Sequence, residues 1–151
     1  MSNDEEVTVR NCVSKNLHTS SETLDKLSND KEGSVRNNVA KNPHTSPKTL
    51  EKLSNDTNEM IRSNVANNQN TSTKMLDKLS KDGAGVVRNE VALNRNTPTD
   101  LLDKLSEDED ISVVQSVIRN PNTSPTTLKK LTKHKNKEVR GEARGWLDYR
   151  T

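Results

Sequence analysis

The chain has 151 residues, with no Phe, one Trp and one Tyr, and its 24 basic and 22 acidic residues give a net charge of +2. This near balance does not point to a nucleic-acid or charged-membrane partner, and the length favours a single domain. Leu, Ile and Val make up only about a fifth of the sequence, at the border of a disordered composition, so a core requires regularly placed apolar residues.

Cys12 is the only cysteine, so an intramolecular disulfide is excluded, which fits a reducing compartment. No apolar run is long enough for the core of a signal peptide or for a membrane-spanning helix. We therefore expect a soluble, cytoplasmic protein with no membrane partner.

Five units of 26 residues follow one another from residue 9 without an insertion, and a sixth begins at residue 139. Each of the five has a Val four positions after its opening aliphatic residue, then an invariant Asn, then two Leu residues three positions apart, with Leu24 and Leu27 as the first such pair. The opening residues are Val9, Val35, Ile61, Val87, Val113 and Val139. A disordered chain has no reason to keep such a register, so the repeat outweighs the composition.

The first part of each unit predicts a short helix. In the unit that begins at residue 35, Val35, Val39 and Ala40 lie at positions that share one face of a helix. Asn42 is expected to end this helix, since Asn tolerates the left-handed backbone conformation and can bond to nearby backbone. A turn follows at residues 43–45.

The second part predicts another short helix, which opens with a hydroxyl N-cap followed by proline. The pair is Ser46-Pro47 in one unit and Ser124-Pro125 in another, and Thr97-Pro98 is expected to act in the same way. A polar linker closes the unit, at residues 30–34, 56–60, 82–86 and 108–112. Because neither helix is stable alone, each unit is expected to bury its apolar residues against its neighbours.

The two ends depart from the pattern. Residues 2–4 match residues 28–30 in register, so the chain is expected to begin at the end of a missing second helix. After Val139 and Arg140 the sequence diverges into a segment that contains both aromatic residues, Trp146 and Tyr149. We expect residues 139–151 to form a C-terminal cap on a single repeat domain that spans residues 1–151.

The units resemble those of the leucine-rich repeat variant family. The resemblance covers residues 9 to about 140 and rests on Val35-Arg36, Val39-Ala40, Asn42-Pro43, Thr45-Ser46-Pro47, Leu50, Leu53, Asp56 and their equivalents. It implies an all-α fold, a right-handed solenoid of two-helix repeats in which α- and 3₁₀-helices alternate. HEAT and armadillo arrays are the alternative folds, although their units are longer, roughly 40–47 residues.

No catalytic or metal-binding constellation is visible, so we expect no enzyme activity, no metal and no cofactor. Some members of the family carry an iron–sulfur cluster, but that needs about four cysteines. His18 and His44 share one register, but neighbouring helices lie roughly 8–10 Å apart, too far for two imidazoles to share a metal. Residues 107–110 lack the alternating ligands of a calcium loop, and residues 83–85 lack the full motif of a phosphate loop.

The recurring Arg of the first helices is the best candidate for binding a partner. The first helices and their turns contain eight basic residues and one acidic residue, Glu90, whereas the linkers, with residues 134–138 counted as the fifth, contain nine acidic residues and three lysines. Such a basic strip can hold phosphate groups or an acidic surface. The candidate partner-binding residues are Arg10, Arg36, Lys41, Arg62, Arg88 and Arg119.

The alternative is that the arginines brace neighbouring units. Asp30, Asp56 and Asp82 each precede an arginine, Arg36, Arg62 or Arg88, by six residues. An acidic residue there would also cap the helix. The two roles can coexist.

The sequence therefore predicts a non-enzymatic binding scaffold that presents an extended Arg/Asn-rich face to a macromolecule, with another protein as the partner. Nucleic-acid binding through the basic strip is the alternative, although the repeats lack aromatic residues for base stacking. A third hypothesis is an accessory subunit of an enzyme.

Overall fold

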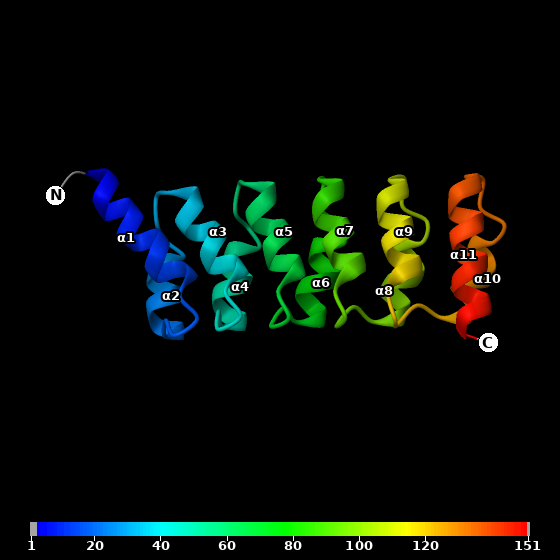
Figure 1. Cartoon of the computed structure of the whole chain (residues 1–151), viewed down its shortest axis with the longest axis horizontal. Helices are drawn as coiled ribbons and strands as arrows, with labels where there is room; N and C mark the ends of the chain where they lie inside the picture. Colours follow the sequence, from blue (N-terminus) through cyan, green and yellow to red (C-terminus); the bar gives the residue numbers. More distant parts are fainter. Residues whose placement is uncertain (1–2, 151) are drawn as a thin grey trace.

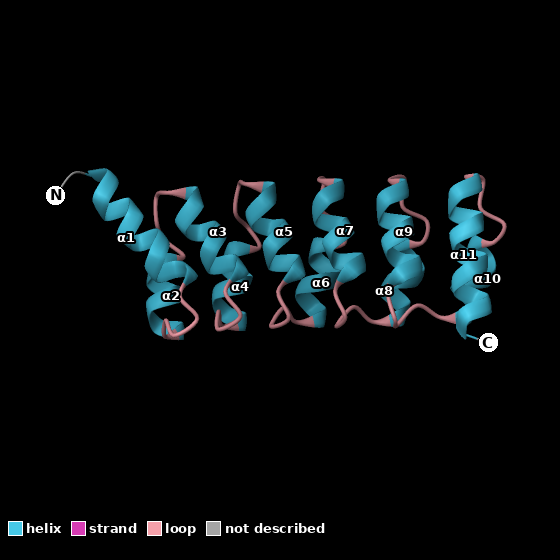
Figure 2. Cartoon of the chain, viewed as in Figure 1, coloured by secondary structure: helices cyan, strands magenta, loops and turns pink. Residues whose placement is uncertain are grey.

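The computed structural model describes residues 3–150, which form eleven helices and no strand (Figure 2). The first helices of the units are α1 (Asn3–Lys15), α3 (Gly33–Lys41), α5 (Glu59–Asn67), α7 (Gly85–Leu93), α9 (Ile111–Arg119) and α11 (Lys137–Arg150). The second helices are α2 (Ser21–Leu27), α4 (Pro47–Leu53), α6 (Thr73–Leu79), α8 (Thr99–Leu105) and α10 (Pro125–Leu131). Among these residues, no helix has both the length and the apolar character that a membrane span requires.

The helices stack in chain order along the long axis of the molecule, with the two ends of the chain at opposite ends of the stack (Figure 1). Each inner first helix packs against the first helices of the units before and after it, and each second helix packs near the first helices that flank it in sequence. The chain is an α-solenoid of two-helix repeats, as the 26-residue spacing predicts.

The core runs through the whole stack and consists mainly of small aliphatic side chains. Val39 and Ala40 of α3 and Leu50 and Leu53 of α4 are buried, and so are their equivalents in the next three units. Because each thin unit is covered on both sides by its neighbours, a few aliphatic residues per unit are enough. This arrangement explains how a sequence so poor in apolar residues folds.

Asn42 ends α3 and its Oδ1 accepts the nearby backbone N–H of His44, as the sequence predicts, but two finer expectations about the helices are wrong. Asn42, the C-cap of α3, has an extended backbone with φ −69° and ψ 126°, and no residue of the described chain has a positive φ. The helix therefore ends without a left-handed residue, because the Asn side chain is engaged elsewhere. Within residues 3–150 both helices of every unit are α-helices, so the alternation with 3₁₀-helices that the family resemblance implies is absent.

Serine N-caps begin four of the five second helices. The Ser46-Pro47 and Ser124-Pro125 pairs start α4 and α10 as the sequence predicts. The expectation for Thr97-Pro98 is wrong, because Pro98 is itself the N-cap of α8 and makes no side-chain cap. The Thr97 hydroxyl instead donates to the backbone carbonyl of Val91.

The two ends of the stack differ. Helix α1 already begins at Asn3, so the expected end of a second helix is not found at residues 3 and 4, and residue 2 lies outside the described residues. Val9 and Val13 are 52% and 36% exposed, although the equivalent Val35 and Val39 are fully buried. At the other end α11 covers the last unit.

In α11, Val139 and Ala143 are fully buried, and Trp146 and Leu147 are partly buried against the core. Tyr149 is exposed and contacts Trp146 edge to face, with ring centroids 6.0 Å apart. The large side chains expected to cover the open end thus do so in part, since Trp146 packs inward and Tyr149 does not.

Truncation of the core should separate buried from exposed aliphatic residues. Leu53→Ala and Val65→Ala each remove methyl groups from sites between units, so each should lower the free energy of unfolding by about 1–4 kcal/mol. Leu93→Ala, at a position that is 40% exposed, is the control. Urea unfolding followed by circular dichroism measures all three, and equal stability of the Leu53 and Leu93 variants would contradict the assigned core.

Candidate binding surfaces

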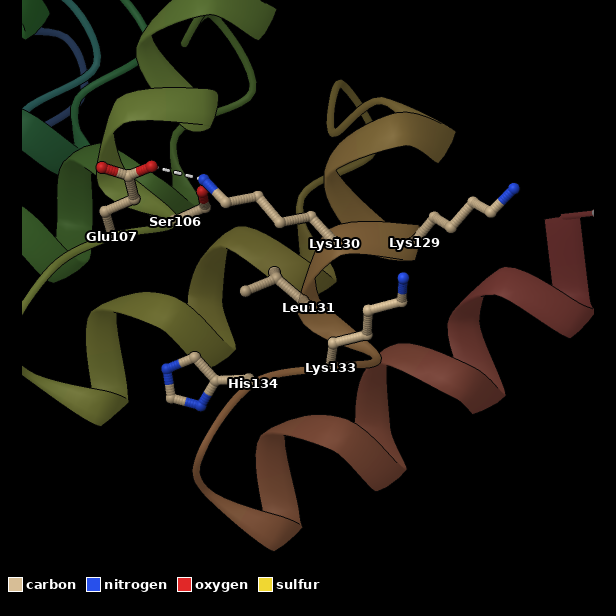
Figure 3. A pocket seen from close by; sticks show the side chains of 7 residues that line it. All are labelled: Ser106, Glu107, Lys129, Lys130, Leu131, Lys133 and His134. Carbon is tan, nitrogen blue, oxygen red and sulfur yellow. Dashed lines mark hydrogen bonds and ion pairs between the residues drawn. The ribbon is translucent and has the colours of Figure 1, made fainter.

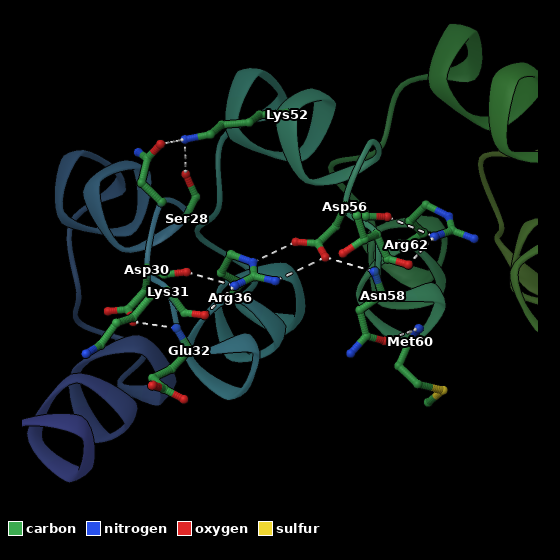
Figure 4. A network of polar contacts seen from close by, with 12 residues as sticks. Ser28, Asp30, Lys31, Glu32, Arg36, Lys52, Asp56, Asn58, Met60 and Arg62 are labelled. Carbon is green, nitrogen blue, oxygen red and sulfur yellow. Dashed lines mark hydrogen bonds and ion pairs between the residues drawn. The ribbon is translucent and has the colours of Figure 1, made fainter. Parts of the chain in front are cut away.

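Four arginines of the first helices bind aspartates of the following linker. Arg36 donates through Nε to Asp56 Oδ2 at 2.7 Å and through Nη2 to Asp56 Oδ1 at 3.2 Å, as Figure 4 shows. Both partners are largely buried, with side chains 20% and 7% exposed. The same two-point contact occurs in each of the Arg–Asp clamps, Arg10–Asp30, Arg36–Asp56, Arg62–Asp82 and Arg88–Asp108.

Three of the four clamp arginines, Arg36, Arg62 and Arg88, also hold the linker in front of their own helix. Arg36 Nη1 donates to the backbone carbonyls of Asp30 and Lys31 at 2.8 and 3.1 Å. The sequence therefore predicts bracing correctly but chooses the wrong carboxylate. Arg36 contacts only the carbonyl of Asp30, six residues earlier, while the Asp30 carboxylate binds Arg10 of the preceding unit.

The aspartate of a clamp also accepts a backbone hydrogen bond within its own linker. Asp82 Oδ1 accepts the backbone N–H of Ala84 at 2.9 Å, which closes the turn after the second helix. The hydrogen bond from Arg62 lowers the pKa of Asp82, and the bond from Ala84 adds to this effect against the opposing effect of burial. The carboxylate is thus ionised at neutral pH and joins two units at one point.

The fifth unit has no clamp, because both the arginine and the aspartate are replaced by other residues. Val114 stands where the earlier units have the arginine and is fully buried, and His134 stands at the register of its aspartate partner. His134 Nδ1 still accepts the backbone N–H of Asn136, at 3.1 Å, so the turn is preserved while the ion pair is not. The joint loss indicates that the arginine and the aspartate depend on each other.

A second set of contacts, the Asn ladder, joins the units at the turn between the two helices. Asn68 Nδ2 donates to the carbonyls of Ala40 and Asn42 in the preceding unit, at 2.8 and 3.1 Å, and its Oδ1 accepts the N–H of Asn70. The members Asn42, Asn68, Asn94 and Asn120 are all buried. Most of the recurring Asn residues are therefore internal and not available to a partner.

The six candidate partner-binding residues do not form one strip. Arg10, Arg36, Arg62 and Arg88 belong to the clamps, whereas Lys41 lies exposed at the end of α3. Arg119 is 52% exposed and donates to Glu142 at 2.6 Å. The sequence analysis did not predict that each arginine pairs with the aspartate 20 residues later. The signal for this pairing was the joint replacement of the arginine at residue 114 and of the aspartate at residue 134.

Outside the clamps and the Asn ladder, the described residues show no evident arrangement for catalysis or for metal binding. Among residues 3–150, no three His, Cys, Asp or Glu side chains gather where they could bind a metal ion. His18 and His44 are exposed in turns, and Cys12 is an exposed free thiol. The depressions on this part of the chain are partly open to solvent, which favours a surface site over an enclosed one.

No protein-family model and no curated protein matches the sequence. A solved leucine-rich repeat variant protein is similar at 23% identity over 92% of this chain, with a TM-score of 0.46, and the chain spans 65% of that protein. Two designed armadillo repeat proteins are similar at 16% and 17% identity, each over 97% of this chain and 94% of their own, with TM-scores of 0.53 and 0.54. The fold is that of a helical repeat solenoid.

The clamps should contribute to stability through specific pairs. Arg62→Gln leaves the largely buried Asp82 carboxylate without its partner, so it should cost about 1–3 kcal/mol at pH 7. Asp82→Asn should have a similar cost, and the double variant should cost less than the sum. Because the folded-state pKa of Asp82 is lowered, this stabilisation should be lost as the pH falls through that pKa.

The exposed pair Lys81 and Asp77 is the control for this double-mutant cycle. Replacing either residue should change the melting temperature little, since exposed ion pairs are weak. Additive losses at Arg62 and Asp82 would show that the clamp is not energetically coupled.

Glu90 is expected to destabilise the fold at neutral pH. It lies half-buried on α7, where Asn38, Asn64 and Ser116 of other units donate hydrogen bonds to the preceding helix. Burial raises the pKa of the Glu90 carboxyl, so folding favours its neutral form and stability is lost as the pH rises through the unfolded and folded pKa values.

Glu90→Gln should therefore raise the melting temperature at pH 7, and the gain should vanish below a pH of about 4, where the wild-type carboxyl is protonated in both states. Glu51→Gln makes the same chemical change at an exposed position of α4 and should have little effect. A gain that persists at low pH would point to a cause other than the buried charge.

Proposed function

We propose that the protein is a non-enzymatic scaffold that binds an extended segment of another protein along its turns. The observation that carries the proposal is the regularity of the turn edge, which comprises residues 15–18, 41–44, 67–70, 93–96 and 119–122. Neighbouring turns are bonded directly, because Asn70, Asn96 and Asn122 donate to the carbonyls of Pro43, Gln69 and Arg95, each at 2.7 Å. Equivalent side chains therefore recur in a fixed row.

The chemistry of the turn edge favours an acidic or amide-rich segment. Lys15, Lys41, Arg95 and Arg119 are exposed there, and the edge contains no acidic residue. A depression of about 430 Å³ lies between two turns and is lined by Lys41, Pro43, Asn64, Asn67, Asn68, Gln69 and Asn70. Side-chain amides can pair with the backbone of an extended peptide, and the cations can pair with its carboxylates.

The clamps support this role indirectly. Arg10, Arg36, Arg62 and Arg88 hold the units at a constant spacing, and a preorganised surface loses less entropy on binding. One of the designed armadillo proteins of similar fold is in complex with the peptide (KR)4, so a helical repeat solenoid can bind a peptide. Nucleic-acid binding is the second candidate, but the edge has no aromatic side chain for base stacking.

Photo-crosslinking in cells of the source organism tests the proposal. A benzoylphenylalanine at Lys41 or at Arg95, on the turn edge, should yield protein adducts, whereas the same residue at the exposed positions Lys48 and Lys74 of the second helices should not. The adduct from position 41 should decrease severalfold when Arg95→Glu and Arg119→Glu are introduced. Equal labelling from both faces would contradict the proposal, and nuclease-sensitive adducts would favour the nucleic-acid alternative.

A further inference from the structure

The last repeat reverses the charge of the surface formed by the second helices and their linkers. Lys129 occupies a position that is acidic in all four preceding units, at Asp25, Glu51, Asp77 and Asp103. His134 likewise replaces the aspartate of the clamps. Residues 129–137 contain five lysines and no acidic residue, and these form the lysine patch, Lys129, Lys130, Lys133, Lys135 and Lys137.

Most lysines of the patch make no polar contact that holds the fold together. Within residues 3–150 the side chains of Lys129, Lys133, Lys135 and Lys137 have no hydrogen bond or ion pair, and all four are exposed. In Figure 3 Lys130 reaches Glu107 of the preceding unit, while the amines of Lys129 and Lys133 contact none of the residues drawn. By contrast, Lys78, at the register of Lys130, binds Ser54 and Asn55 within the stack.

Unpaired like charges at such short spacing repel one another, so the patch weakens the fold unless an anion neutralises it. The missing clamp is what permits the cluster. Because Val114 requires no carboxylate at residue 134, the linker can lack the aspartate of the other units, and His134 still closes the turn. The fifth repeat therefore lacks the ion pair of the clamps and has a cationic surface instead.

We propose that the lysine patch binds a short acidic segment of a protein that carries an apolar side chain. A depression of about 540 Å³ lies beside α10 and is lined by Ser106, Glu107, Lys129, Lys130, Leu131, Lys133 and His134. The aliphatic stems of its lysines can cover an apolar side chain while their ammonium groups meet the flanking carboxylates. This surface is separate from the turn edge, so the inference does not rest on the proposed function.

The observations favour carboxylates over a nucleic-acid backbone. The patch offers single ammonium charges and no arginine, so it lacks the planar fork that makes two-point contacts with phosphates and carboxylates alike. It has no aromatic residue on which nucleic-acid bases could stack. The patch also covers only one repeat, which suits a short peptide segment.

Fluorescence anisotropy with the full chain tests the inference. The probe is a labelled peptide of alternating Glu and Ser with one central Leu, and a Gln/Ser peptide with the same Leu is the uncharged reference. The triple variant Lys129→Gln, Lys133→Gln, Lys137→Gln should bind the acidic probe at least about tenfold more weakly than the wild type, from three lost contacts. The control Lys48→Gln, Lys74→Gln, Lys104→Gln removes the same charge from exposed positions of α4, α6 and α8 and should bind within about twofold of the wild type.

Thermal melting of both variants shows whether they fold, and the patch variant should melt no lower than the wild type because it loses only repulsion. Equal weakening by the two triple variants would overturn the inference, since it would reflect net charge alone. So would wild-type affinity that is the same for the acidic and the uncharged peptide. A single-stranded DNA of equal charge that binds more tightly, with the same loss in the patch variant, would assign the surface to nucleic acid instead.

Discussion

The stack depends on one interaction, the hydrogen bonds from a buried Asn carboxamide to the backbone of the preceding unit. The first helices α1, α3, α5 and α7 each end with a carbonyl group that accepts the side-chain N–H of the Asn of the next unit, and such a buried group is costly when it is unpaired. Asn68 satisfies two of these groups with Nδ2 and fixes its own turn with Oδ1. An aliphatic residue there would leave the Ala40 carbonyl and the Asn70 N–H without these bonds, whereas the Asn42 carbonyl would keep its bond from the Thr45 N–H.

The Arg–Asp clamps apply the same logic to the other connection of each unit. The Asn ladder fixes the turn between the two helices, and the clamp fixes the linker between units, so consecutive units are joined at both ends of their first helices. A two-point guanidinium–carboxylate contact is directional, and it therefore sets the angle between units as well as their distance. At the last junction the clamp is absent, and the longer helix α11 covers the unit with Val139, Ala143 and Trp146 instead.

Much of the fold could be predicted from the sequence because the same apolar positions recur in each unit. The positions of Val39, Leu50 and Leu53 predict two helices and their buried faces, and the structure confirms them. The aspartate that pairs with each clamp arginine could not be identified in this way. Asp30 is nearer to Arg36 in sequence, but the solenoid places Asp56 of the next linker against the guanidinium, which only the packing of units decides.

The wrong expectation at Asn42 has the same origin, because its local preference for a left-handed backbone is overridden by bonds to another unit. The ladders also separate the charged residues into two groups. The arginines of the clamps are engaged in holding the units, so substitutions there should alter binding only through stability. In the described chain the side chains of Lys41, Arg95 and the lysines of the patch other than Lys130 make no hydrogen bond or ion pair, so selection on these residues can act on a partner without changing the stack. A repeat protein whose register is fixed by internal polar ladders can therefore vary its exposed side chains unit by unit, and the reversal of charge at Lys129 is such a change on an unchanged backbone.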